Sequence, residues 1–453
     1  MIFQRGLKQM KVRLWKLTLL FFVLLCSASL FFHWNRIEQR SQVVEPSADH
    51  TKPRSLTDLY PPWLAARESL LRRRDPYGSD VTREIQLAYF GRELDSSHIS
   101  DLSNAQRFSL AYRFAYPIYT VLFLAPTIKM QFHTAQIVSW WFFLSATLVA
   151  VFLWLRFLRL RPHASTLVAV FAMLLSSIPV MQGLRLLQLG LLVAALIAAA
   201  ALSVAKGRLF LAGALLALAT IRPQMSVLVI AWFTLWLSAA WTQRRSLLWG
   251  FGVTLAALLL ASEYLRPGWL LRYPAVLAAY ADYTGAASLL GLLMPSTLHW
   301  PLMIGALLTA SAFCWRARRQ PANSSAFAIA LGFALTLTVL IVPTVIPPFN
   351  HVLLLPVALL MILHWKDLWR NNTFARFASV VFCGFAFLPW LLAVIFVFLP
   401  SALRQSQLLW SAPLTASLAL PFAAFGSLML MGKLADASSS GHPTSSGSQE
   451  GLA

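Results

Sequence analysis

Acidic side chains are scarce in this sequence. Its 453 residues include 16 Asp and Glu against 37 Lys and Arg, so the formal net charge is +21 at pH 7. Charged residues make up 12% of the chain and hydrophobic residues 58%. One water-soluble core cannot bury so much apolar surface. The composition therefore excludes an ordinary soluble domain and predicts an all-α polytopic membrane protein.

Cysteine is scarce as well. Cys26, Cys314 and Cys383 lie in apolar runs at unrelated spacings, which excludes a disulfide framework and a zinc site. No other residues form a convincing set of metal ligands, so neither a metal nor another cofactor is predicted. The excess Lys and Arg lie mostly in short loops between apolar runs, a pattern that indicates membrane topology and attraction to anionic lipid rather than nucleic-acid binding.

Apolar runs of about 20 residues predict about twelve transmembrane helices. The first, near 14–34, follows five basic residues and is expected to be an uncleaved anchor. Residues 112–128, with Pro117 and Pro126, are expected to re-enter the membrane as a hairpin, because a span there would put the later basic loops outside. Both termini then lie in the cytoplasm, in a bacterial-type plasma (inner) membrane. The other predicted spans are 137–155, 164–181, 186–204, 209–221, 225–240, 247–265, 298–315, 324–343, 351–365, 376–399 and 411–432.

The chain is expected to have four parts. Residues 1–35 are the basic cytoplasmic N-terminus and first span, 36–107 an outer-face loop, 108–432 the transmembrane core, and 433–453 a disordered Ser/Gly-rich cytoplasmic tail. Within the loop, one interfacial helix is predicted from Pro61 to about Arg74, and a second from Ser79 or Asp80 to Gly91.

The acidic residues gather in this outer loop, where 11 of the 16 lie between Glu38 and Asp101. Asp75 is expected in the turn between the two loop helices, and it is the candidate general base. An Asp-Pro pair is also a common turn former, so a purely structural role stays open. Asp80 is a candidate substrate-binding residue, although its position is more typical of a helix N-cap.

Other polar residues are predicted to reach the same membrane face. A cationic side chain there can hold the phosphate of a lipid-linked donor, and an ionised Asp can accept the proton of an acceptor hydroxyl. Structural alternatives stay open: snorkelling for Arg222, hydrogen bonding within the fold for Arg185 and Gln188, and helix capping for His351. The candidate substrate-binding residues are Tyr77, Asp80, Tyr116, Arg185, Gln188, Arg222, Gln224, Asn350 and His351.

At several of these residues the sequence resembles glycosyltransferase family 87, the polyprenol-phosphate-mannose-dependent mannosyltransferases of the membrane-embedded GT-C group. The resemblance covers roughly residues 70–365. It implies a GT-C-like fold and inverting transfer of a sugar, with mannose expected, from a polyprenyl-phosphate donor to a glycan or glycolipid acceptor at the extracytoplasmic face, with Asp75 as the base. The matching pieces are Asp75-Pro76-Tyr77, Phe114-Ala115-Tyr116-Pro117, Gln188 after a short loop, and Arg222-Pro223-Gln224.

The sequence departs from the family pattern at two of these motifs. Leu187 precedes Gln188 where the family often has Gly, and Arg222 stands where the family usually has Lys, which keeps the charge. The main alternative is a secondary transporter or flippase of a lipid-linked or small polar substrate. Such proteins often carry acidic residues near the bilayer midplane and internal repeats, and neither is evident here. A lipid-binding scaffold protein is the third possibility.

Overall fold

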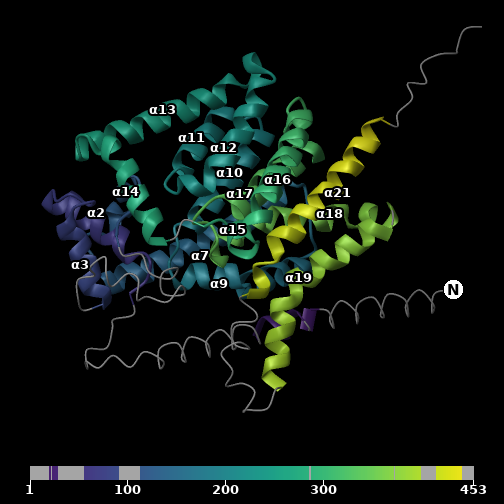
Figure 1. Cartoon of the computed structure of the whole chain (residues 1–453), viewed down its shortest axis with the longest axis horizontal. Coiled ribbons are helices and arrows are strands. Elements are labelled where there is room, and N and C mark those ends of the chain that lie inside the picture. The colour runs from purple at the N-terminus through teal and green to yellow at the C-terminus, as the bar shows by residue number, and fades with distance from the viewer. Residues whose placement is uncertain are drawn as a thin grey trace, which may run out of the picture.

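The structure, a computed structural model, describes residues 20–21, 23–28, 56–90, 113–284, 287–371, 373–398 and 415–440. These residues form helices joined by short loops, without a strand among them, which confirms the predicted helical class (Figure 1). Most of the predicted first span, and parts of the outer loop, lie outside the described residues. The helices of the outer loop and of the segment that follows it are α2 (Tyr60–Arg72), α3 (Ser79–Phe90), α6 (Thr120–Leu124) and η1 (Ala125–Thr127).

Each predicted span from residue 137 onward overlaps one of the later elements, whereas α14 (Trp269–Thr284) and α15 (Leu289–Leu293) lie between two predicted spans. The later elements are α7 (Phe132–Phe157), α8 (Ala164–Ser176), α9 (Ile178–Arg185), α10 (Gly190–Ala205), α11 (Leu209–Ala219), α12 (Pro223–Ser238), α13 (Trp241–Leu265), α14, α15, α16 (Ser296–Ala317), α17 (Ser325–Ile341), η2 (Pro348–Leu354), α18 (Leu355–Asn371), α19 (Thr373–Phe398) and α21 (Leu420–Ser440). The last of these continues beyond Lys433, where the sequence predicted a disordered tail.

Six helical segments of the described chain are long and apolar enough to cross a membrane: 132–157, 241–265, 296–317, 348–370, 376–395 and 415–433. The pair α8 and α9 makes a seventh if counted as one span, and it bends by 57° at Ser177, just before α9, whose second residue is Pro179. The helices α10, α11, α12 and α17 are apolar but shorter. The fold is therefore that of a membrane-inserted helical protein, and the count of twelve spans stays a prediction.

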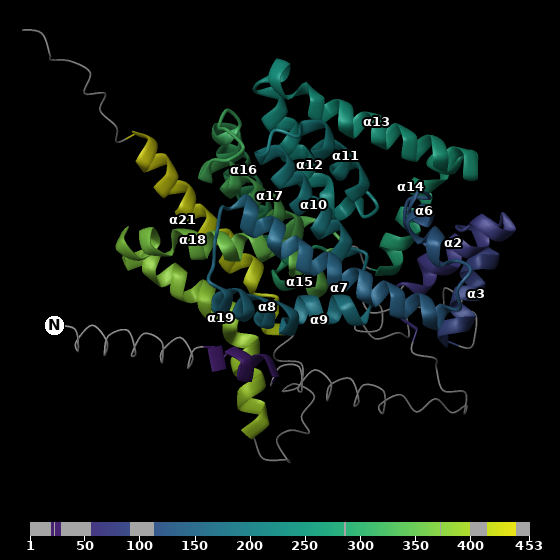
Figure 2. The same ribbon diagram turned by 180° about the vertical axis from the view of Figure 1, so that it is seen from behind.

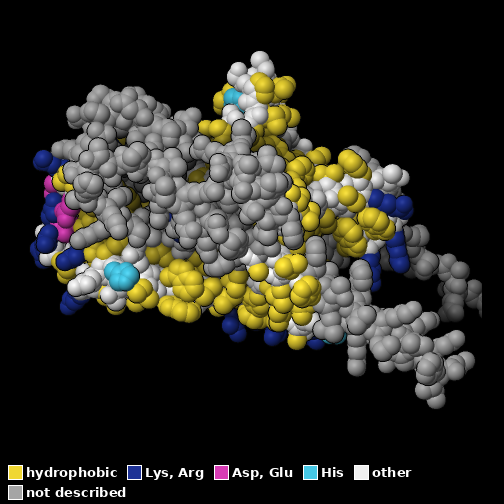
Figure 3. Space-filling view, turned by 90° about the horizontal axis from the view of Figure 1, so that it is seen from below, with side chains coloured by type: hydrophobic (Ala, Val, Ile, Leu, Met, Phe, Trp, Pro, Cys, Tyr) yellow, Lys and Arg dark blue, Asp and Glu magenta, His cyan; other side chains and the backbone are white. Residues whose placement is uncertain are grey.

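Small residues let the central helices approach one another closely. A side-chain carbon added at Gly213 of α11 would lie 2.0 Å from the Leu247 carbonyl oxygen, and one at Gly250 of α13 would lie 1.9 Å from the Phe210 carbonyl oxygen. Glycine at both positions therefore permits direct backbone contact between α11 and α13, as is common between membrane helices. Hydrophobic side chains cover much of the described surface on the face in Figure 3, with Lys and Arg at its edges.

The two helices of the outer loop lie at one end of the molecule, beside α6 and α14 and far from α18, α19 and α21 (Figures 1 and 2). Helix α2 packs on α6 and η1, where the Trp63 indole donates to the Thr127 carbonyl oxygen at 3.2 Å. The predicted re-entrant segment thus contains two short helices, of five and three residues, which are too short to cross a bilayer.

Candidate active site

Four polar side chains from distant parts of the chain meet in one hydrogen-bonded cluster. The Arg222 guanidinium donates from Nη1 to Gln188 Oε1 at 3.1 Å and to Asn350 Oδ1 at 3.4 Å. Gln188 in turn donates from Nε2 to the Asp58 carboxylate. Three of the four are predicted site residues, and Gln188, Arg222 and Asn350 are all buried. We refer to Asp58, Gln188, Arg222 and Asn350 as the polar cluster.

Gln188 reaches the polar cluster because helix α9 ends in a tight left-handed turn. Leu187 has a φ of 54°, its N–H donates to the Leu184 carbonyl, and the Gln188 N–H donates to the Gly183 carbonyl at 2.9 Å. These bonds form the Schellman motif, in which a residue with positive φ follows the helix end. Glycine adopts that conformation more readily than leucine, so Leu187 holds this turn with some backbone strain.

Arg222 is held at the break between α11 and α12. It directly precedes Pro223, the first residue of α12, and its backbone is extended at φ −128° and ψ 81°, as the following proline favours. Its guanidinium lies 5.7 Å from the centroid of the Phe349 ring, a cation–π distance. A side-chain carbon at Gly190 would lie 2.8 Å from Arg222 Nη1, so Gly190 leaves the space that the guanidinium occupies. Arg222 therefore does not snorkel to a membrane surface.

Asn350 and His351 lie on the short 3-10 helix η2, where the prolines before them prevent a regular helix. The Asn350 amide donates to the Val345 carbonyl at 3.3 Å, so this side chain supports both the local turn and Arg222. A hydrogen bond of 3.2 Å from the Phe349 N–H to Gln182 Oε1 ties η2 to α9. His351, the next residue, is also buried.

Asp58 is a functional candidate that the sequence analysis missed. It lies two residues before α2, whose start is fixed by a hydrogen bond from the Tyr60 N–H to the Thr57 carbonyl. Asp58 keeps partial exposure, yet burial of its carboxyl raises the pKa from 3.8 to about 7, while Arg222 and the hydrogen bond from Gln188 act in the opposite direction. A carboxyl group that titrates near neutral pH is suited to accept a proton.

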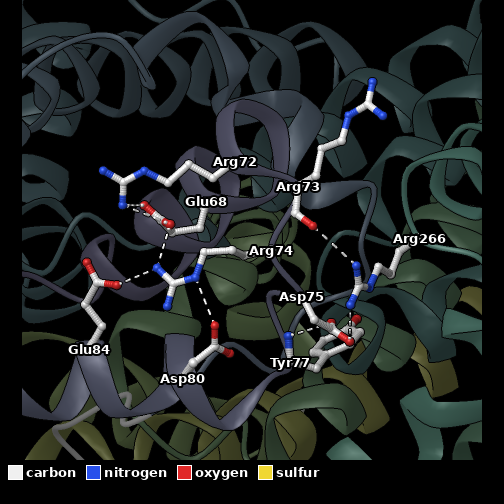
Figure 4. Close-up of polar contacts among 9 residues, drawn as sticks. All are labelled: Glu68, Arg72, Arg73, Arg74, Asp75, Tyr77, Asp80, Glu84 and Arg266. Carbon is white, nitrogen blue, oxygen red and sulfur yellow. Dashed lines mark hydrogen bonds and ion pairs between the residues drawn. The ribbon is translucent and has the colours of Figure 1, made fainter.

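Asp75, the predicted base, lies in the turn between α2 and α3, as expected. Its carboxylate, however, binds arginine side chains and a backbone N–H outside the polar cluster (Figure 4). Arg266 and Arg272 each approach its Oδ2 at 3.0 Å, and the Tyr77 N–H donates to its Oδ1 at 3.1 Å. No described contact joins Asp75 to the polar cluster. The structure thus pairs a different acidic residue of the outer loop, Asp58, with Gln188 and Arg222.

The remaining charges of this turn neutralise one another. Arg74 contacts Glu68 at 2.7 Å and Asp80 and Glu84 at 2.9 Å each, as Figure 4 shows. Asp80 is the second residue of α3 rather than its N-cap, and its carboxylate binds Arg74. This network fixes the position of α3 against α2, and it gives Asp80 a structural contact.

Tyr77 connects the Asp75 turn to the neighbourhood of the polar cluster. Its hydroxyl donates to the Tyr116 carbonyl oxygen at 2.7 Å, and burial raises the pKa of both tyrosines. Tyr116 and Tyr280 of α14 both lie close enough to Arg222 and Asp58 to interact electrostatically with them. Of the other predicted residues, Arg185 ends α9 half-buried, and Gln224 lies in the first turn of α12 outside these contacts.

The arrangement brings a fixed cation to the oxygen, and a carboxyl group of raised pKa to the nitrogen, of one glutamine amide. Among the described residues no three His, Cys, Asp or Glu side chains come close enough together to hold a metal ion. The described cluster offers two functions: Arg222 can bind an anion, and Asp58 can exchange a proton.

Comparison with known proteins gives one match. The family model of glycosyltransferase family 87 matches residues 114–343, just over half of the chain. The matched stretch contains Gln188 and Arg222, whereas Asp58 and Asp75 lie before it and Asn350 and His351 after it. The chain matches no curated protein and no solved structure.

Proposed function

Since the chain belongs to glycosyltransferase family 87 and therefore transfers a sugar, we propose that its donor is a polyprenyl-phosphate sugar, with mannose as the expected sugar. The acceptor is a glycan or glycolipid, and the reaction takes place at the extracytoplasmic face of the plasma membrane, with both termini in the cytoplasm. One observation carries the proposal: Gln188 joins the Arg222 guanidinium to the Asp58 carboxylate.

Arg222 is the proposed site of the donor phosphate. Its guanidinium is buried, its Nη1 is held by Gln188 and Asn350, and its Nε has no hydrogen-bond partner among the described residues. A guanidinium presents several donors in one plane, so a phosphate can bind the remaining ones in a bidentate manner. The apolar helices around the cluster are compatible with a donor that arrives from the bilayer.

Asp58 is the proposed general base. The acceptor hydroxyl oxygen attacks the anomeric carbon of the donor sugar, the bond from that carbon to the phosphate oxygen breaks, and the hydroxyl proton passes to the Asp58 carboxylate. Polyprenyl phosphate leaves with the bonding electrons, and Arg222 balances its negative charge. A single displacement of this kind inverts the configuration at the anomeric carbon.

Asp75 remains the second candidate for the base, because the family resemblance points to it. Its two arginine partners argue for Asp58, since both of them contact the Asp75 carboxylate and occupy its Oδ2. Tyr77, Tyr116, Asn350 and His351 are proposed to order the two sugars around the reacting atoms. The proposal for His351 is supported by its burial on η2, directly after Asn350 of the polar cluster.

The proposal is tested with the purified full-length protein, a panel of polyprenyl-phosphate sugars and detection of product by mass. We expect one donor to support transfer, Asp58→Asn and Arg222→Met to abolish it, and Arg222→Lys to retain part of it. Asp367→Asn is the matched control, because the Asp367 side chain is 68% exposed on α18. Full transfer by Asp58→Asn together with loss in Asp75→Asn would reverse the assignment of the base.

A further inference from the structure

Helix α14 carries its aromatic residues on one side. Trp269, Tyr273 and Tyr280 are four and seven residues apart, a spacing that places them on the same face of a helix. Leu270, Leu271 and Leu277 are exposed by 53%, 88% and 39%; Leu271 lies opposite the aromatic residues, and Leu270 and Leu277 lie beside them. Helix α14 therefore points aromatic rings inward and aliphatic side chains outward.

The inward face of α14 lies next to the polar cluster. The Tyr273 ring is 6.1 Å from the ring of Tyr77, and Trp269 is 6.3 Å from Tyr119. Tyr77 donates to the Tyr116 carbonyl, and Tyr119 donates to Thr220, two residues before Arg222. Tyr273 thus packs on Tyr77, which bonds to Tyr116, a residue close to Arg222 and Asp58.

The Tyr273 hydroxyl is buried and has no hydrogen-bond partner among the described residues. Its neighbours differ in this respect, because the hydroxyls of Tyr77 and Tyr119 both donate to backbone carbonyls. A buried hydroxyl without a partner lowers stability, and such groups in native proteins usually have a functional reason. A ligand that binds at the site can supply the missing partner.

Asp75 holds the start of α14 in place. The chain reaches α14 through Arg266-Pro267-Gly268, where Gly268 has a φ of +74°. Arg266 and Arg272 stand on either side of the first turn of α14, and both contact the Asp75 carboxylate at 3.0 Å. These ion pairs join α14 to the turn that carries Tyr77, on which the Tyr273 ring packs.

We propose that Tyr273 hydrogen-bonds a hydroxyl group of a sugar bound at the site, and that Asp75, Arg266 and Arg272 are positioning residues that hold Tyr273 there. The inference rests on the proposed function and adds a specificity-determining contact to it. A phenol both donates and accepts, and it lies among rings that pack well against sugar faces. The hydroxyl belongs either to the donor sugar or to the acceptor sugar, and the experiment separates the two.

The test combines Tyr273→Phe with substrates that lack one hydroxyl each. For wild type we expect one deoxy substrate to show a KM raised about five- to tenfold, the loss of one hydrogen bond. Tyr273→Phe should have the same raised KM for the intact substrate and should no longer distinguish it from that deoxy analogue. A deoxy donor with this effect identifies the donor sugar, and a deoxy acceptor identifies the acceptor sugar. Tyr264→Phe is the control, because Tyr264 is 87% exposed on neighbouring α13.

A second set of variants tests the ion pairs. Asp75→Asn should raise the same KM and leave kcat within about twofold, and the exchange Asp75→Arg with Arg272→Asp should restore part of the affinity. Loss of kcat in both variants would mean that Asp75 acts as the base, which an exchanged charge cannot replace. If Tyr273→Phe still distinguishes every deoxy analogue from the intact substrate as wild type does, the inference is overturned. Transfer by wild type would still uphold the proposed function in that case. Absence of transfer by wild type with every donor would overturn both.

Discussion

Replacing Asp58 by Asn should abolish sugar transfer and stabilise the folded protein at neutral and alkaline pH. The pKa of this carboxyl is about 7 in the folded protein and 3.8 in a model peptide, chiefly because of burial. The folded state therefore holds the proton more tightly than the unfolded state. Ionisation of Asp58 lowers the free energy of unfolding progressively as pH rises from about 4 to 7, and the penalty is constant above that range. At about 1.4 kcal/mol per pKa unit, the penalty is at most about 4 kcal/mol, and partial exposure of Asp58 reduces it.

Thermal unfolding followed by tryptophan fluorescence in detergent measures this effect. At pH 8 the Tm of Asp58→Asn should exceed that of wild type, and the difference should shrink as pH falls and nearly vanish below about pH 4, where Asp58 is protonated in the folded and the unfolded protein alike. Asp367→Asn, at an exposed acidic residue, should show no such pH-dependent difference. Equal Tm values for wild type and Asp58→Asn at pH 8 would show that the carboxyl group is not held in an unfavourable environment, and its assignment as a base of raised pKa would fail.

Three further results are expected. The pH profile of kcat/KM should rise with an apparent pKa of about 7, the pKa of Asp58. The profile of kcat should rise at higher pH, because the bound donor phosphate offsets the Arg222 charge, which lowers the pKa of Asp58. Identical profiles would argue against phosphate binding at Arg222. Gly190→Ala should lower activity at least tenfold, because the added methyl group displaces the Arg222 guanidinium. Gly252→Ala is the control, since there is open space around Gly252. Equal activities of the two variants would contradict the close approach of Gly190 to Arg222. Leu187→Gly should relieve about 1 kcal/mol of backbone strain but lose more stability by leaving a cavity at a buried position. Its Tm should therefore fall while its activity persists. Loss of activity at full expression would show that the turn at residue 187 is not what positions Gln188.

The positions of the membrane helices could be predicted from the sequence because apolar runs and their polar interruptions are local features. Each predicted span from residue 137 onward overlaps a helix of the structure. The bend at Ser177 was missed, although Pro179 marks the restart of α9, because the apolar run itself continues through it. The number of membrane crossings depends on how short helices such as α10 and α11 pack, and hydropathy alone does not contain that information.

Part of the candidate site was also within reach of the sequence. Gln188, Arg222 and Asn350 were selected because polar residues next to helix breaks in a membrane protein tend to be functional, and the structure brings them together. The sequence alone could not show which acidic residue of the outer loop joins them. Asp58 and Asp75 are both acidic residues of the outer loop, and an Asp-Pro-Tyr turn draws more attention than an Asp ahead of an apolar helix. Only the packing of α2 against α6 decides which carboxyl group lies beside Gln188.

The role of Gln188 follows from what it prevents. Asp58 and Arg222 have opposite charges, and a direct ion pair between them would lower the pKa of the carboxyl and occupy the guanidinium. The glutamine amide donates to the one and accepts from the other, so each is held in place while no direct ion pair forms between them. The carboxyl then keeps its raised pKa, and the guanidinium keeps donors for a phosphate. The proton acceptor and the anion site that the proposed reaction needs are thus kept apart by one carboxamide group.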